Sequence, residues 1–222
     1  MTKKTELINR VLLENKKDIY EMIGTSKVID KIFLRVFYLI SKWRLLYDKL
    51  DKMQNADVIF AFSFGLGKND SLGQTNRALV YVTRSIHKKT SIPIFAQWEI
   101  AEELKLVGIK TSFSAYPKKG FLTTKGVVDQ FLNHDKKRKI KKVIVVAHPD
   151  HQFRCGELLK KLGYKVYFPR ISEYLPKDGW KHFNCDNFGY WKDSAQPWTT
   201  SRKLYIKHEI YTRINSYYKN EL

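Results

Sequence analysis

The spacing of apolar residues along the chain changes near residue 57. Before that point apolar side chains recur every three or four residues, as they do on one face of a helix. Two helices are predicted within residues 5–53, with a break at residues 24–27, and the second is expected to continue through Leu50. We therefore expect residues 1–54 to form a helical extension.

From residue 57 onward, short apolar runs alternate with segments of helical periodicity. The runs are nearly continuous, which is typical of strands that are buried on both faces of a parallel sheet. Strands are predicted at residues 57–62, 92–96, 109–113, 142–147 and 164–168, and helices at residues 75–87, 99–106, 123–133, 153–162 and 199–218. This order predicts a Rossmann-like, three-layer α/β domain with a mostly parallel sheet over residues 55–222, ending in a C-terminal helix.

The residues that follow the strand at 142–147 are rich in side chains that carry chemistry. His148, Asp150, His151 and Arg154 lie within seven residues, and ligands of parallel α/β sheets bind beyond the carboxyl ends of the strands. Arginine suits a phosphate or carboxylate, and histidine donates a hydrogen bond or transfers a proton near neutral pH. Capping of a helix would explain Asp150 but not its neighbours. We predict His151 as a catalytic residue and the other three as ligand-binding residues.

Two other strand ends carry candidate residues. Gly65 and Gly67 follow the first strand, where glycines let backbone N–H groups approach an anion, although such a loop is also an ordinary turn. Glu99 follows the second strand and is our second catalytic candidate, as a base or a hydroxyl acceptor. It could equally complement the dipole of the helix that begins there.

A metal site is not predicted. Two histidines and a carboxylate could hold a metal ion, but the spacing His-x-Asp-His is not a standard zinc pattern. The two cysteines, Cys155 and Cys185, form no Cys-x-x-Cys pair and provide neither a disulfide framework nor a ligand set. Together with the lack of an apolar signal segment or a membrane-length apolar run, they favour a reducing cytoplasm.

The net charge of +19 and the pI near 9.8 favour an acidic partner. Nucleic acid, an anionic lipid surface or a small phosphorylated molecule would each fit. However, lysines are scattered from Lys3 to Lys219, as they are on an ordinary lysine-rich surface. The densest basic run, residues 135–142, joins a predicted helix to a predicted strand and is expected to be a solvated connector.

An aromatic segment at residues 189–201 precedes the last helix. Trp191 and Trp198 flank Ser194 and Gln196, an arrangement that could stack on a sugar or base or form a lid. The alternative is an aromatic plug that docks the last helix, with a threonine, Thr199 or Thr200, as the helix cap.

Residues 143–166 resemble the strand, His-x-x-Arg and helix segment of the YdcF/SanA/ElyC family, a domain of unknown function. Three further stretches, residues 76–78, 99–109 and 123–128, agree with that family in order, so the resemblance covers about residues 57–168. It implies a Rossmann-like fold with a polar pocket and a nucleotide-type or phosphorylated ligand. The residues that it carries over are Arg77, Glu99, Thr124, His151 and Arg154.

The chain also departs from the family pattern. Gln97-Trp98 replaces a Gly-Gly pair after the second strand, and the glycine-rich first turn is reduced to Gly65 and Gly67. We expect no membrane anchor of the kind seen in the envelope members, so the resemblance does not imply an envelope role.

Three functional hypotheses follow. In the first, an enzyme acts on a small phosphorylated or nucleotide-linked substrate: Arg77 and Arg154 bind the anion while His151 and Glu99 handle protons. In the second, a binding or sensor module uses the same pocket without turnover. In the third, a basic protein binds nucleic acid, with an affinity that falls steeply with salt. No residue pattern predicts a particular cofactor.

Overall fold

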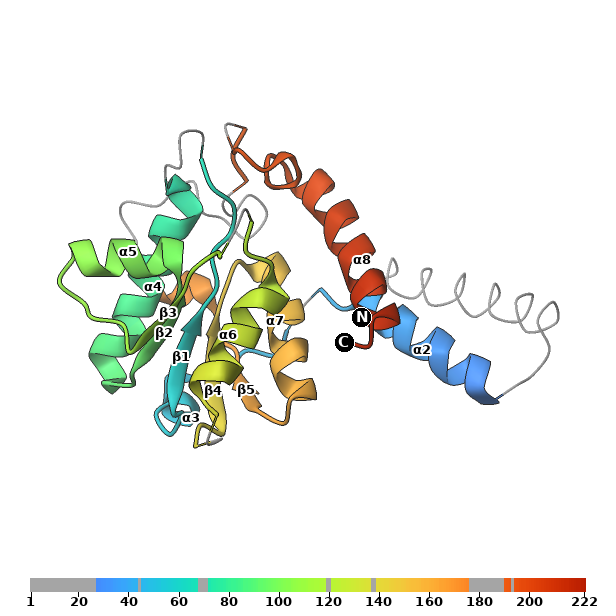
Figure 1. The fold of residues 1–222 in the computed structure, drawn as a ribbon, viewed down its shortest axis with the longest axis horizontal. Helices are drawn as coiled ribbons and strands as arrows, with labels where there is room; N and C mark the ends of the chain where they lie inside the picture. Colours follow the sequence, from blue (N-terminus) through green and yellow to red (C-terminus); the bar gives the residue numbers. More distant parts are fainter. Residues whose placement is uncertain are drawn as a thin grey trace. The chain divides into compact units, whose positions relative to one another are not determined.

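The computed structural model describes residues 27–43, 45–67, 72–118, 121–136, 139–175, 190–192 and 194–222 (Figure 1). The chain divides after Ser41. One helix, α2 (Lys27–Ser41), is described before the division, and residues 42–222 form one compact unit that contains all the other described elements. The first of the two predicted N-terminal helices lies outside the described residues.

Five strands form one parallel sheet in the order β3-β2-β1-β4-β5. They are β1 (Val58–Ala61), β2 (Ile94–Gln97), β3 (Phe113–Ala115), β4 (Lys142–Val146) and β5 (Lys165–Tyr167). The central strand β1 pairs Ile59 with Ile94 on one side and with Ile144 on the other. The predicted parallel α/β sheet is confirmed.

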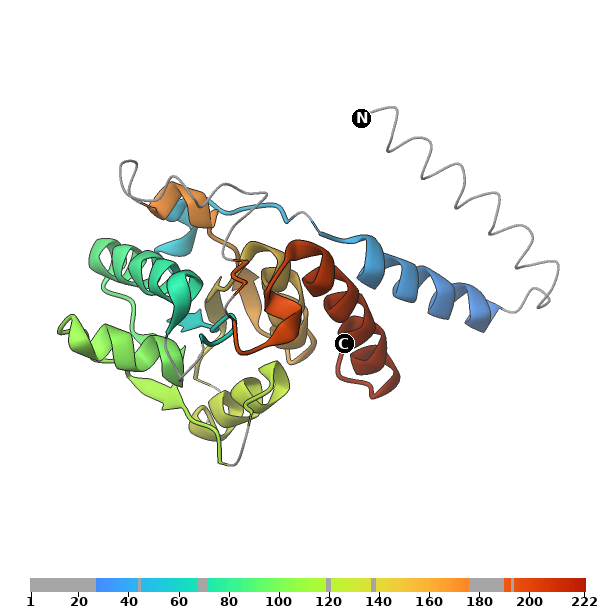
Figure 2. The same cartoon turned by 90° about the horizontal axis from the view of Figure 1, so that it is seen from above.

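Helices cover both faces of this sheet. On one face lie α4 (Gly73–Thr90) and α5 (Trp98–Leu106), and on the other lie α6 (Thr124–His134) and α7 (Pro149–Lys161) (Figure 1). Because a strand–helix–strand crossover is right-handed, the connections that run toward β3 place α4 and α5 on one face, and those that run toward β5 place α6 and α7 on the other (Figure 2). The result is the three-layer arrangement predicted for this domain.

The side chains of β1 alternate between two buried layers, as a strand between helices requires. Ile59 and Ala61 join the apolar cluster that includes Leu79 and Val82 of α4. Phe60 points the other way and packs against Phe131 of α6, with ring centroids 4.8 Å apart.

The sheet order reverses direction at β1. Two crossovers lead from β1 outward through β2 to β3, and the chain then returns to pair β4 with the opposite edge of β1. Crevices for ligands form at such reversals, outside the carboxyl ends of the strands. The loops after β1 and β4 therefore occupy the favoured position for a site.

Two element boundaries differ from the sequence prediction. The strand expected at residues 109–113 begins only at Phe113, because the Ile109 N–H donates to the Leu104 carbonyl at 2.9 Å and prolongs the turn that ends α5. Helix α7 begins at Pro149 rather than at Phe153. His151 therefore lies on the first turn of a helix and not in a loop before it.

The two ends of the chain need further corrections. The predicted helix through Leu50 ends at Ser41, and Leu50–Met53 form a separate short helix, α3. The backbone just before α3 lies beside the edge of the sheet, where the Asp48 N–H donates to the Phe168 carbonyl at 2.8 Å. The last helix, α8 (Arg202–Tyr218), begins after the expected Thr199.

Two short 3₁₀ helices, η2 (Ile171–Tyr174) and η3 (Pro197–Thr199), complete the described elements. No helix in the described part of the chain has both the length and the apolar character needed to cross a membrane.

Candidate functional site

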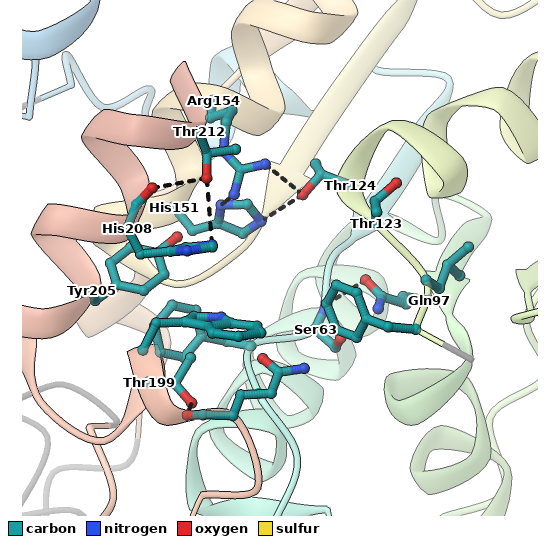
Figure 3. A pocket seen from close by; sticks show the side chains of 16 residues that line it. Ser63, Gln97, Thr123, Thr124, His151, Arg154, Thr199, Tyr205, His208 and Thr212 are labelled. Carbon is teal, nitrogen blue, oxygen red and sulfur yellow. Dashed lines mark hydrogen bonds between the residues drawn. The ribbon is translucent and has the colours of Figure 1, made fainter. Parts of the chain in front are cut away.

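A cavity of about 220 Å³ opens at the carboxyl ends of the central strands (Figure 3). Its wall is built from the loop after β1, the end of β2, the entrance to α6, the first turns of α7, η3 and one face of α8. Its polar lining includes Ser63, Gln97, Thr124, His151, Arg154 and His208.

Arg154 is a cationic group of this cavity, and three other residues hold its side chain in place. Its Nε donates to both carboxylate oxygens of Glu209 on α8, at 3.1 and 3.0 Å, and its Nη1 donates to the Thr124 hydroxyl at 3.0 Å. Its Nη2 lies 3.3 Å from His151 Nδ1. A guanidinium carries five N–H groups, so these contacts hold the side chain in place and leave further donors for an anion.

The same contacts determine the protonation of His151. Because a guanidinium donates and never accepts, Nδ1 of His151 accepts from Arg154 and carries no proton. The neutral ring then holds its proton on Nε2, which lies 3.4 Å from the Thr124 hydroxyl (Figure 3). Burial and the neighbouring Arg154 charge lower the pKa of His151 to about 4. At neutral pH His151 is therefore a hydrogen-bond donor rather than a cation.

Glu209 anchors the cluster from α8. Its carboxylate accepts from Arg154, from Nε of Arg213 at 2.9 Å and from the Tyr205 hydroxyl at 3.0 Å. Burial raises the pKa of Glu209, but the charges of Arg154 and Arg213 outweigh it and hold the pKa well below the usual range. Glu209 therefore pairs with two guanidinium groups, those of Arg154 and Arg213.

Glu99 lies behind the cavity floor. It is 3% exposed, and Gln97 links it to the lining: Gln97 Nε2 donates to Glu99 Oε1 at 3.3 Å, and Gln97 Oε1 accepts the Ser63 N–H at 3.2 Å. The second oxygen, Oε2, has no hydrogen-bond partner within the described residues. Burial raises the pKa of Glu99 to about 7, against hydrogen bonds from its own N–H, Ser63 and Gln97.

His148 and Asp150 are engaged in structural contacts beside the cavity. The His148 side chain caps α7 by accepting the Asp150 N–H at 3.2 Å, and its ring stacks on Phe64 with centroids 3.8 Å apart. The cap of α7 is thus His148, not Asp150 as the capping interpretation assumed. The Asp150 carboxylate accepts from Arg202 at 2.9 Å and from the Tyr190 hydroxyl at 2.6 Å. These contacts fasten the C-terminal segment.

The two predicted glycines lie under the segment that precedes α8. Gly65 has φ of +72°, and a Cβ at this position would lie 2.8 Å from the Thr199 hydroxyl, so both conformation and space require glycine. Gly67 forms an antiparallel bridge with Ser194. Gly65 lines the cavity, whereas Gly67 supports the loop from outside its lining.

Arg77 does not join the other predicted residues. It is exposed on α4 and is not part of the cavity lining. Its neighbour Asn76 is buried and holds the β1 loop: Oδ1 accepts the Phe64 N–H at 2.7 Å, and Nδ2 donates to the Gly65 carbonyl at 2.7 Å. The helix start therefore meets the loop through the amide of Asn76.

The aromatic segment before α8 forms part of the wall. The indole of Trp198 lines the cavity and stacks on His208, with centroids 4.7 Å apart and planes 13° from parallel. The cap of α8 is Ser201, whose hydroxyl accepts the Leu204 N–H at 3.4 Å, and not one of the two threonines expected there.

Sequence reasoning missed the contribution of α8. Tyr205, His208 and Thr212 line the cavity, and Glu209 clamps Arg154 from the same helix. These four residues are three or four positions apart and share one helix face. The face of α8 that packs against the domain would normally be apolar. The polar residues on that face were the feature of the sequence that could have revealed its role.

Within the described residues, no three His, Cys, Asp or Glu side chains lie together in a way that could hold a metal ion. Comparisons of the chain with protein-family models, curated proteins and solved structures found no match.

Proposed function

We propose that this chain is a divergent YdcF-like protein that binds a small phosphorylated or nucleotide-type ligand in the cavity at the strand ends. The observation that carries the proposal is the placement of Arg154. It is a buried guanidinium that lines a cavity and is held in one orientation by Glu209, Thr124 and His151.

The surroundings of Arg154 suit an anion. The described lining includes the Arg154 guanidinium and no carboxylate. The entrance to α6, where Thr123 caps the helix by accepting the Gly126 N–H at 3.1 Å, lies in the same wall. A helix N-terminus favours negative charge.

The aromatic wall suits a ring or another apolar part of the same ligand. Phe121 meets the Trp198 indole edge to face, with centroids 6.2 Å apart, and both side chains line the cavity. A charged end beside an aromatic end matches a phosphorylated organic molecule better than a long anionic polymer.

The protonation states favour binding over proton transfer by His151. With a pKa of about 4, its neutral ring is a weak base and cannot donate from an imidazolium at neutral pH. Glu99 has a pKa of about 7, which suits an acid or base, but its carboxyl lies behind Gln97. The enzymatic alternative therefore requires Glu99 to act through Gln97 or Ser63.

Calorimetric titration tests the proposal. The full chain is titrated with inorganic phosphate, a sugar monophosphate and nucleoside monophosphates, and each is also assayed for turnover. Thr124→Val removes one hydroxyl that faces Arg154 at nearly unchanged volume, and Arg154→Lys keeps the charge while losing the planar fork. We expect both variants to bind at least about tenfold more weakly, a loss of about 1.4 kcal/mol.

Arg77→Lys is the matched control, because Arg77 is exposed on α4 outside the cavity. It should bind as the unaltered chain does. The assignment of this cavity would be refuted if the Thr124 and Arg154 variants, with intact circular dichroism, bound as tightly as the unaltered chain. It would also be refuted if all three variants lost affinity equally.

A further inference from the structure

His208 is an ionisable group of the cavity lining that stands on α8, far in sequence from the His-x-x-Arg segment. It is half-buried and lines the cavity together with Arg154 and His151. One face of its ring is covered by the Trp198 indole. Its Nε2 lies 3.4 Å from the Thr212 hydroxyl (Figure 3).

The Thr212 contact determines which nitrogen of the neutral ring carries the proton. The Thr212 hydroxyl already donates its proton to the His208 carbonyl at 2.8 Å, so it can only accept from Nε2. The neutral ring therefore holds its proton on Nε2, and a second proton would go to Nδ1.

The charges around His208 oppose that second proton while the cavity contains no anion. Burial and the Arg154 charge lower the pKa of His208, and Glu209 raises it by a smaller amount. The cavity lining also contains the titratable groups His151 of α7, which is neutral, and Tyr205 of α8, whose pKa is raised by burial. A dianion placed beside Arg154 would reverse this balance, because it neutralises the charge that repels the proton.

Resting on the function proposed above, we propose that His208 is the second anion contact of the cavity and takes up one proton from solvent when a dianion binds beside Arg154. The proton adds to Nδ1, no covalent bond of the ligand changes, and the imidazolium then faces the anion from α8. The Trp198 ring stabilises the charged ring from its face. The cavity thereby prefers dianions over monoanions.

Sulfate is the probe, because phosphate changes its own charge near neutral pH whereas sulfate stays a dianion. Glu99 also titrates in this range, with a pKa of about 7, so the measurements are made in the Glu99→Gln background. Sulfate affinity is measured by calorimetry from about pH 8 to about pH 6, and proton uptake is obtained from two buffers that differ in ionisation enthalpy.

In that background we expect sulfate affinity to rise as the pH falls, by about tenfold per pH unit where the uptake approaches one proton per sulfate. Adding His208→Gln or His208→Phe should abolish most of the rise and the uptake. The phenylalanine keeps a flat ring against Trp198, so a folded variant is available even if glutamine disturbs the packing. Adding His134→Gln, on the exposed end of α6, is the matched control and should change neither.

If the rise and the uptake persist in the His208 variants, the inference is wrong. If sulfate binding depends on Arg154 but shows no pH dependence in the Glu99→Gln background, the anion site stands and the role of His208 is refuted. If sulfate does not bind at any pH and no phosphorylated ligand binds, the proposed function fails as well.

Discussion

Arg154 of α7 and Glu209 of α8 form a buried ion pair across 55 residues of sequence, with Nε 3.0 and 3.1 Å from the two carboxylate oxygens. The Glu209 side chain has no exposed surface, and that of Arg154 is 10% exposed. A buried charge is costly unless it is paired and hydrogen-bonded. The geometry of the cavity therefore depends on the position of α8.

Replacing Glu209 tests this dependence. Glu209→Gln leaves two buried guanidinium groups without their carboxylate, and we expect the free energy of unfolding to fall by about 3–5 kcal/mol. Urea denaturation followed by circular dichroism measures the loss. Glu173→Gln is the control, because Glu173 pairs with Arg170 on the surface, where such a pair contributes at most about 1 kcal/mol. Equal losses in the two variants would contradict the anchoring role of Glu209.

The core of the fold was predictable because each central strand is buried on both faces. Residues 58–62 and 143–147 are apolar without interruption, and the structure places β1 and β4 at these two runs. The edge strand β3 was misplaced because Ile109 belongs to the turn that ends α5, where a backbone contact with Leu104 decides the conformation. Because an isoleucine fits either a strand or such a turn, the apolar pattern does not distinguish the two.

The site was predictable only where the strand-end rule applies. That rule pointed to the segment containing His151 and Arg154, and the structure brings these residues together with Thr124 and Gly65 in one cavity. It could not reveal Glu209, because the partner of Arg154 is chosen by packing between two helices. The family resemblance also pointed to Arg77, but this residue lies on the exposed side of α4.

His151 should remain neutral well below the usual range of histidine. Because its pKa lies at about 4, we expect an NMR titration to show an uncharged ring at pH values near 6, with the proton on Nε2 and none on Nδ1. Loss of the signal in His151→Gln assigns it. A midpoint near 6.5, or protonation of Nδ1 in the neutral ring, would show that Arg154 does not donate to this histidine.

Glu99 should make stability fall as the pH rises. Its pKa is raised from 4.5 to about 7, so its contribution to folding is complete below about pH 4.5 and is lost as the pH passes through about 7. Glu99→Gln cannot ionise. The free energy of unfolding of this variant should therefore rise relative to that of the unaltered chain by about 2–3 kcal/mol as the pH goes from about 5 to about 8. Urea denaturation at both values measures the difference. A gain that is the same at both would mean that Glu99 ionises normally.

Gly156 should not tolerate a methyl group although it lies within a helix. A Cβ at Gly156 of α7 would meet the Phe168 ring at 2.2 Å, and Phe168 is buried beyond the end of β5. Alanine normally stabilises a helix by about 0.5–1 kcal/mol relative to glycine, but overpacking here should cost more, for a net loss of about 1–3 kcal/mol.

Gly126→Ala in α6 is the control, because its nearest neighbour is the terminal carbon of Leu122 at 3.0 Å, at the end of a flexible side chain. Thermal unfolding should rank Gly156→Ala below the unaltered chain and Gly126→Ala at or above it. If Gly156→Ala proved as stable as Gly126→Ala, α7 would not pack on Phe168 as closely as described, and the position of His151 and Arg154 on that helix would shift with it.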